Sequence, residues 1–247
     1  MVAGVLFDFS GTLLRIESVE SWLRAVLRES GVPMSPEEFR RAADGLRTAG
    51  ALPGGPPPER LPDELAHAWE IRDRAPELHR ELYTGLSRQV DLPAAELHDA
   101  LYDRHRTPVA WHPYPDAKQV LATLDARGVA VGVVSNIGWD LRPIFRTHGL
   151  DRHVDTYVLS CEHGVVKPDR RIFELACARL RLAPEEVLMV GDDPVADGGA
   201  AQLGCQVHLV DPLPVTERPD GLLPVLDRVA APAHPTTTDP RPPDEEP

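Results

Sequence analysis

The sequence predicts an α/β fold: a parallel sheet with helices on both faces and an all-helical segment inserted after the first strand. From about Pro113 onward, short β-branched runs alternate with helical patterns, which is the element order of such sheets. Between about residues 17 and 105 the apolar residues recur at helical spacing instead. The 247 residues, 42% of them hydrophobic, can bury a substantial core. We therefore expect one domain with an insertion.

The first expected strand is Val5–Phe7, which ends at Asp8 just before a glycine turn. Within the helical segment, a helix is expected to begin at Ser35, because Ser35 and Glu38 have the spacing of a capping box. The stretch Leu52–Pro58 contains too much proline and glycine to form a helix or a strand. It is expected to be a loop inside the helical segment.

The second half of the chain supplies the remaining elements of the sheet. Four further strands are expected over Val129–Val134, Tyr157–Leu159, Val187–Val190 and Val207–Val210, with helices over Asp116–Arg127 and Arg170–Arg181 among them. Residues 1–15 and 111–230 are expected to form the core and residues 16–110 the helical insertion. Residues 231–247 are rich in proline and acidic residues, and they lack the apolar side chains that offset the entropy of ordering. We expect a disordered tail there.

Composition excludes several classes of function. A net charge of -13 with scattered basic residues disfavours binding to nucleic acid. No apolar run approaches the roughly 20 residues that span a membrane, and the first four residues lack the positive flank of a signal peptide. The three cysteines, Cys161, Cys177 and Cys205, have no metal-binding spacing. These features predict a cytoplasmic protein that does not bind membranes.

Polar or charged side chains follow the first three strands of the predicted sheet. The first strand ends at Asp8, a carboxylate whose burial requires a partner. The second ends in Ser135 and Asn136, whose hydroxyl and amide groups can bind the oxygens of an anion. Lys167 follows the third strand and precedes Pro168, which can begin the next helix. Because the carboxyl ends of parallel strands meet at one edge, we expect these side chains to lie together.

The fourth of these strand ends is acidic. Asp192, Asp193 and Asp197 follow Gly191 within one loop and helix start. Clustered carboxylates repel one another unless a cation lies among them, and an all-oxygen site suits Mg²⁺. A nucleophilic carboxylate, small donors, a lysine and an acidic loop together predict a site for phosphoryl transfer.

These four groups, in this order, resemble the motifs of the haloacid dehalogenase (HAD) superfamily. The motifs are Asp8-Phe9-Ser10-Gly11-Thr12-Leu13, Ser135-Asn136, Lys167-Pro168, and Gly191-Asp192-Asp193 with Asp197. The resemblance covers nearly all of the chain before the tail. It implies a Rossmann-like core and an α-helical cap inserted between the first and second motifs.

The resemblance also implies a covalent mechanism. Asp8 would attack phosphorus to form an aspartyl-phosphate, while Mg²⁺ and Lys167 neutralise the phosphoryl oxygens. By similarity, Mg²⁺ would be held by the carboxylates of Asp8 and Asp192 and by the backbone carbonyl of Ser10.

The other motif residues would support this chemistry. By the same resemblance, Ser135 and Asn136 would bind the phosphoryl group and Thr12 would brace the turn after the first strand. Asp193 and Asp197 would be further acidic groups, acting through water or by orienting the lysine. The sequence does not rank these two aspartates.

Ser10 departs from the phosphatase pattern of the superfamily, which usually has an aspartate there as general acid and base. A serine hydroxyl is a poor substitute, and a rate loss of roughly 10²–10⁴ is expected if nothing compensates. Three explanations stay open: a substrate with a good leaving group, another acid such as His163 or a carboxylate of the cap, or a slow or idle enzyme. If the missing acid limits the rate, Ser10→Asp is expected to raise turnover. Glu162 is a weaker candidate for a role in the chemistry.

Three functions follow from these observations. The first is a Mg²⁺-dependent phosphatase of a small phosphorylated metabolite, the substrate class that a covering cap favours. The second is a dehalogenase-like hydrolase, which does not need the carboxylate cluster retained at Asp192 and Asp193. The third is a weakly catalytic or non-catalytic interaction protein on the same fold. The phosphatase explains the most residues, and the sequence makes no prediction of an oligomeric state.

Overall fold

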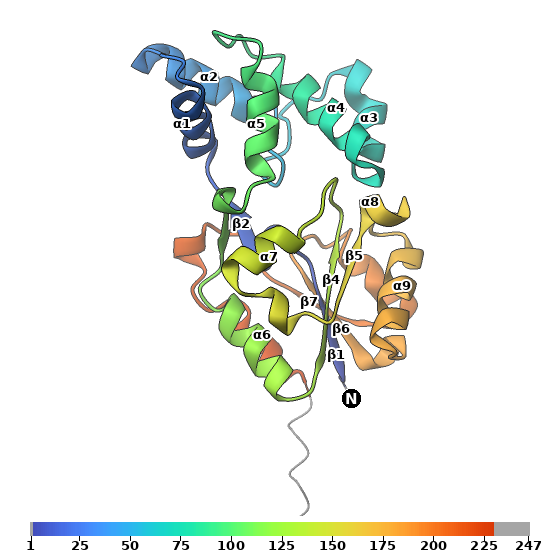
Figure 1. The fold of residues 1–247 in the computed structure, drawn as a ribbon. Coiled ribbons are helices and arrows are strands. Elements are labelled where there is room, and N and C mark those ends of the chain that lie inside the picture. Colours follow the sequence, from blue (N-terminus) through green and yellow to red (C-terminus); the bar gives the residue numbers. More distant parts are fainter. Residues whose placement is uncertain (1, 230–247) are drawn as a thin grey trace, which may run out of the picture.

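The computed structural model describes residues 2–229, and Figure 1 shows their arrangement. The tail expected over residues 231–247 lies outside the described residues. Within residues 2–229, no helix combines the length and the apolar character needed to span a membrane.

A five-stranded parallel sheet forms the centre of the fold. Its order is β5-β4-β1-β6-β7. The strands are β1 (Gly4–Phe7), β4 (Ala130–Ser135), β5 (Thr156–Leu159), β6 (Val187–Gly191) and β7 (Gln206–Leu209). Val5 of β1 pairs with Val131 on one side and with Leu188 on the other. The first strand is therefore the central one, so that Asp8 follows it at the middle of the carboxyl edge.

Helices cover both faces of the sheet, as predicted. Val5 and Phe7 point into one core with residues of α6 (Ala117–Ala126) and α7 (Arg142–His148). Leu6 points the other way, into a second core with α9 (Arg170–Leu180). A strand that is buried on both faces reads as a continuous apolar run, which is why β1 lacks alternation in the sequence. The α/β Rossmann-like fold is confirmed.

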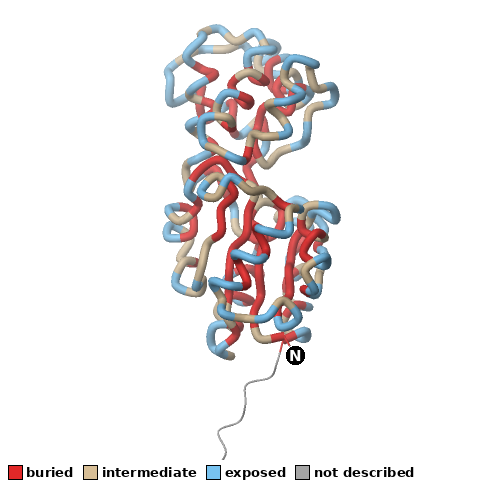
Figure 2. Tube along the Cα trace, turned by 90° about the vertical axis from the view of Figure 1, so that its right-hand side faces the viewer, coloured by how far each residue is buried: buried red, intermediate tan, exposed pale blue. Residues whose placement is uncertain are grey.

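The segment after β2 folds into helices that lie beyond the carboxyl edge of the sheet (Figure 1). They are α1 (Val19–Ser30), α2 (Pro36–Thr48), α3 (Ala66–Ile71), α4 (Pro76–Ser87) and α5 (Leu97–His105), with a 3₁₀ turn, η2 (Arg72–Arg74), between α3 and α4. We call these elements the helical unit. The Ser35–Glu38 capping box is present at the start of α2. Figure 2 shows buried residues inside the helical unit as well as in the sheet.

Two short strands connect the helical unit to the rest of the chain. β2 (Leu14–Ile16) and β3 (Trp111–Pro113) pair antiparallel, with Arg15 opposite His112. The sequence did not reveal this pair, because three residues are too few to show alternation. Beside it, Arg104 Nε donates a 2.8 Å hydrogen bond to Oε1 of the buried Glu17.

The remaining elements are short. They are α8 (Ser160–His163) and the 3₁₀ turns η1 (Asp63–Leu65), η3 (Pro108–Ala110), η4 (Asp151–His153), η5 (Pro184–Glu186), η6 (Gly198–Leu203), η7 (Val215–Glu217) and η8 (Leu223–Asp227).

Candidate active site

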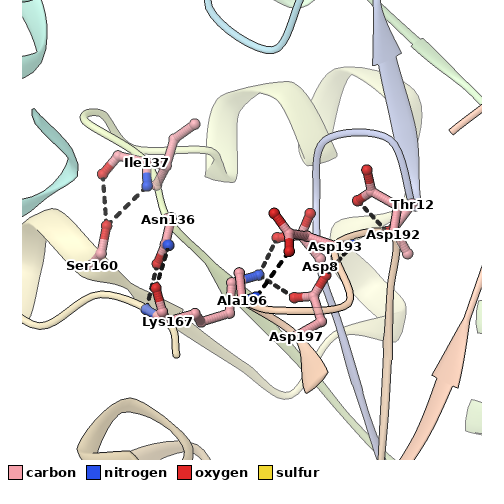
Figure 3. Close-up of polar contacts among 10 residues, drawn as sticks. All are labelled: Asp8, Thr12, Asn136, Ile137, Ser160, Lys167, Asp192, Asp193, Ala196 and Asp197. Carbon is pink, nitrogen blue, oxygen red and sulfur yellow. Dashed lines mark hydrogen bonds and ion pairs between the residues drawn. The ribbon is translucent and has the colours of Figure 1, made fainter. Parts of the chain in front are cut away.

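A buried lysine bridges two carboxylates at the carboxyl edge of the sheet. Lys167 Nζ donates hydrogen bonds of 2.6 Å to Oδ1 of Asp8 and 2.6 Å to Oδ1 of Asp197 (Figure 3). The exposed fractions of the three side chains are 3% for Lys167, 10% for Asp8 and 1% for Asp197. Three segments far apart in sequence therefore meet at one point, as the strand-end argument predicted.

Asp193 and Asp197, in the acidic loop after β6, make different contacts. Oδ2 of Asp197 accepts a 3.0 Å hydrogen bond from the backbone N–H of Asp193. Oδ1 of Asp193 accepts from the backbone N–H groups of Val195 and Ala196, at 2.8 and 2.9 Å. Asp193 thus shapes the loop, while Asp197 orients the lysine. The sequence alone did not distinguish these two roles.

Asp192 and Thr12 connect this loop to the turn after β1. Thr12 Oγ1 donates a 3.1 Å hydrogen bond to Oδ1 of Asp192. Gly11 has a φ of +81°, and a Cβ at this position would lie 2.5 Å from Oδ2 of Asp192. The glycine therefore supplies both the left-handed turn and the space for the carboxylate.

The Ser135-Asn136 pair follows β4 and lines the same cavity as Asp8. The side chain of Asn136 bonds the backbone of Lys167 in both directions: Nδ2 donates to its carbonyl at 2.9 Å, and Oδ1 accepts from its N–H at 2.7 Å. Asn136 therefore fixes the position of the lysine. Ser135 is buried.

Ser10 lines the cavity, whereas Glu162 and His163 lie outside it. Glu162 forms an exposed ion pair with Arg142 at 2.7 Å. His163 Nε2 lies 3.3 Å from a guanidinium nitrogen of the exposed Arg179. Neither residue therefore lines the cavity that contains Asp8.

Burial and crowding of like charges control the electrostatics of the site. Burial raises the pKa of Asp8 to about 7, with Lys167 opposing the shift and the charges of Asp197 and Asp192 adding to it. Burial also raises the pKa of Asp192, with Asp197 contributing. Burial by itself would lower the pKa of Lys167, but Asp197 and Asp8 outweigh it, so the ammonium is retained. The site has a surplus of negative charge.

This donor set fits a divalent cation. Carboxylate oxygens of Asp8, Asp192 and Asp197 lie within 4.8 Å of one another. The backbone carbonyl of Ser10 accepts no hydrogen bond from residues 2–229, so that oxygen is also available. Oxygen donors with an excess of carboxylates over ammonium groups suit Mg²⁺.

Arg218, which the sequence did not single out, supports the turn after β1. Its Nη1 donates to the carbonyl oxygen of Gly11 at 2.7 Å, and its Nη2 donates to that of Thr12. The guanidinium carbon lies 3.2 Å from the ring centre of Tyr114, and the residue is only 4% exposed. It lies in irregular chain near the C-terminus, where no periodic pattern distinguishes it from a surface arginine.

The cavity above these residues has a volume of about 520 Å³ and is lined by both parts of the molecule. The helical unit and the loops near it contribute aromatic and ionisable groups, among them Trp69, Arg72, Asp73, His79 and Tyr83. A cavity of this size suits a small molecule, since ligand sites commonly measure roughly 300–1,000 Å³.

Comparison with known proteins places this site in a family. Residues 2–204 match the family described as haloacid dehalogenase-like hydrolase. The phosphoserine phosphatase of Thermus thermophilus is 38% identical over 112 residues, which are 44% of this chain and 43% of that protein. The (S)-2-haloacid dehalogenase 4A of Burkholderia cepacia is 37% identical over 93 residues, 37% of this chain and 40% of that protein. The chain therefore aligns with less than half the length of either relative.

Solved structures show the same fold. The L-2-haloacid dehalogenase of Xanthobacter autotrophicus is 23% identical, with a TM-score of 0.59 over 91% of this chain and 83% of that one. With the match over residues 2–204, these findings establish that the chain belongs to the haloacid dehalogenase-like hydrolases.

Proposed function

We propose that this hydrolase is a Mg²⁺-dependent phosphatase that acts on a small phosphorylated metabolite through an aspartyl-phosphate on Asp8. The observation that carries the proposal is the buried ammonium of Lys167 between Asp8 and Asp197, beside the further carboxylate of Asp192. This combination attracts both a phosphoryl group and the metal that neutralises it. A reaction that needs no metal would leave three carboxylates facing one ammonium.

Each residue has a part in the reaction. Lys167 binds Oδ1 of Asp8, which leaves Oδ2 to attack phosphorus. The same ammonium can contact a phosphoryl oxygen, and Ser135 offers a hydroxyl from the end of β4. Asp8, Asp192 and the carbonyl of Ser10 would hold Mg²⁺, which when bound would withdraw charge from the phosphoryl oxygens.

The helical unit is proposed to be the cap, with residues 16–110 as the cap and residues 1–15 and 111–230 as the core. Its side chains line the cavity together with those of the sheet edge. A cavity of about 520 Å³ lined by both parts of the molecule suits a small metabolite better than a folded protein. The cysteines are free thiols, which supports a reducing compartment such as the cytoplasm.

Phosphate release from a broad panel of phosphorylated metabolites tests the proposal, with Mg²⁺ and with EDTA. We expect Mg²⁺-dependent turnover that Asp8→Asn abolishes. Asp91→Asn is a matched control, because Asp91 is an exposed aspartate between α4 and α5 that does not line the cavity. Halide release from 2-chloropropionate without metal would instead identify a dehalogenase. No turnover in either assay would leave an interaction protein as the better explanation.

A further inference from the structure

The cavity contains a carboxylate that the proposed phosphatase chemistry does not yet use. Among the acidic side chains that line it within the described chain, Asp73 alone comes from the helical unit. We propose that Asp73 is the catalytic acid and base of this enzyme, in place of the aspartate that Ser10 replaces. The inference rests on the proposed function and names the group that completes it.

A short path of hydrogen bonds holds Asp73 at the site. Ser160 Oγ, at the start of α8, donates to the backbone carbonyl of Asp73 at 2.5 Å and accepts from the N–H of Ile137 at 2.9 Å. Ile137 directly follows Asn136, whose amide bonds the backbone of Lys167 (Figure 3). The turn that carries Asp73 is thus fixed to the same loops that fix the lysine.

The carboxyl group of Asp73 remains available. Its side chain is 12% exposed, and it faces the cavity. Arg72 Nε lies 3.4 Å from Oδ2 and His79 Nε2 lies 3.8 Å from Oδ1. Within residues 2–229 neither oxygen accepts a hydrogen bond of ordinary length. A carboxyl group held in place without a hydrogen-bond donor can bind a leaving-group oxygen.

The groups around Asp73 act on its pKa in both directions. Burial raises its pKa, against the lowering effects of Arg72 and Lys167. The other groups that face it are His79 and Tyr83 on α4 and Cys161 on α8. Burial lowers the pKa of His79 to about 3 and raises that of Tyr83 to about 12, so neither adds charge near neutral pH.

Ser10 and His79 are less suited than Asp73 to act as the catalytic acid. Ser10 faces the backbone of the loop that follows α2, since a Cβ at Gly54 would lie 2.8 Å from Ser10 Oγ. His79 Nδ1 already bonds the hydroxyl of Tyr102 at 2.9 Å. The Ser10 hydroxyl therefore lies close to this loop, and the neighbouring histidine is neutral and already hydrogen-bonded.

Asp73 would act once in each of the two chemical steps. Oδ2 of Asp8 bonds to phosphorus while the phosphorus–oxygen bond to the leaving group breaks, and the carboxyl proton of Asp73 moves to the departing oxygen. The Asp73 carboxylate then takes a proton from the water that attacks phosphorus. The bond from phosphorus to Asp8 breaks, releasing inorganic phosphate and restoring both side chains. The net reaction is a phosphate ester plus water giving an alcohol and phosphate.

A series of phosphate esters with leaving groups of increasing basicity tests this role. The probes are 4-nitrophenyl, phenyl and 4-methoxyphenyl phosphate, assayed with Mg²⁺. We expect Asp73→Asn to lower kcat/KM for the more basic leaving groups by roughly 10²–10⁴-fold. It should affect the 4-nitrophenyl ester far less, since that leaving group departs without a proton. The plot of log kcat/KM against leaving-group pKa therefore becomes steeper, which a merely structural residue would not cause.

Three further variants complete the design. Asp63→Asn is the matched control, because Asp63 is an exposed aspartate in η1, between α2 and α3, and does not line the cavity. Asp73→Glu keeps an acid and should restore part of the shallow slope. Ser160→Ala removes the hydrogen bond to the Asp73 backbone without deleting the acid, so it tests the idea even if Asp73→Asn fails to fold. Circular dichroism reports folding for each.

The outcomes separate the two proposals. A steeper slope in Asp73→Asn, or a smaller steepening in Ser160→Ala, supports Asp73 as the acid. An unchanged slope with Asp8-dependent turnover overturns Asp73 and leaves the phosphatase standing. No Asp8-dependent release from any phosphate ester overturns both.

Discussion

Replacing Lys167 with methionine gives the sharpest test of the site's electrostatics. The substitution keeps most of the side-chain volume and removes the ammonium between Asp8 and Asp197, which it contacts at 2.6 Å each. Breaking a buried ion pair costs about 3–5 kcal/mol, because a charge is left uncompensated. For a chain of this size each kcal/mol shifts Tm by about 2–4 °C, so we expect Tm to fall by roughly 6–20 °C at pH 8.

The loss also depends on pH. The ammonium stabilises Asp8 only where Asp8 is ionised, which is above its pKa of about 7. The difference in Tm between wild type and Lys167→Met should therefore widen as the pH rises from 5 to 9. Added Mg²⁺ should reduce the difference, because a second cation then compensates the carboxylates.

Thermal unfolding followed by circular dichroism, in EDTA, measures the effect. The chain offers a matched control, since its other lysine, Lys118, is exposed on α6. We expect Lys118→Met to change stability by no more than about 0.5 kcal/mol. If Lys167→Met shifted Tm no more than Lys118→Met at pH 8, the ammonium would not hold the site together, and the reasoning would be refuted.

Three further predictions concern the same site. Because the pKa of Asp8 is raised from 3.8 to about 7, the folded chain binds this proton more tightly than the unfolded chain. Proton binding at Asp8 therefore adds its full contribution to the free energy of unfolding below about pH 4, and this contribution is lost as the pH rises through 7. Asp8→Asn should match wild type near pH 4 and exceed it above pH 7, by on the order of 4 kcal/mol at most in urea unfolding with EDTA; equal stability at both pH values would contradict this. Arg218→Leu should lower the free energy of unfolding by at least about 3 kcal/mol in the same assay, because it leaves the carbonyls of Gly11 and Thr12 without their charged donor; Arg218→Lys should not restore this, and full stability in either variant would argue that Arg218 does not support the turn. Ser10→Asp should give no gain in phosphate release, because Ser10 Oγ lies close to Gly54 and Asp73 supplies the proton; a tenfold gain would show that the missing acid at position 10 limits the rate.

The sequence predicted the sheet well because its strands are buried on both faces. A continuous apolar run such as Val187–Val190, between a helical pattern and a glycine, is typical of a buried strand. All five strands of the parallel sheet lie within about a residue of their expected limits. The short pair β2 and β3 was missed because it has no periodic signal. The tertiary pairing of Arg15 with His112 defines it, and no local pattern encodes that contact.

Some residues of the candidate site could likewise be predicted from the sequence and others could not. Asp8, Lys167 and Asp192 could be predicted because each follows a strand of the parallel sheet. The carboxyl ends of these strands lie at one edge, so the three side chains lie there too. Asp73 and Arg218 do not follow strands of the sheet, so the position of strand ends does not predict where they lie. A 3₁₀ turn in the helical unit and an irregular segment near the C-terminus have no fixed relation to the sheet. Only packing decides where they lie, so sequence patterns could not reveal them.

The pairing of β2 with β3 brings the two ends of the helical unit side by side. The chain leaves the core and returns to it on adjacent strands, with Ile16 directly opposite Trp111. A tight turn joining these two residues would close the core into a continuous chain without rerouting any strand of the main sheet. The length of the helical unit can therefore change between these two positions without altering the strand order of the main sheet.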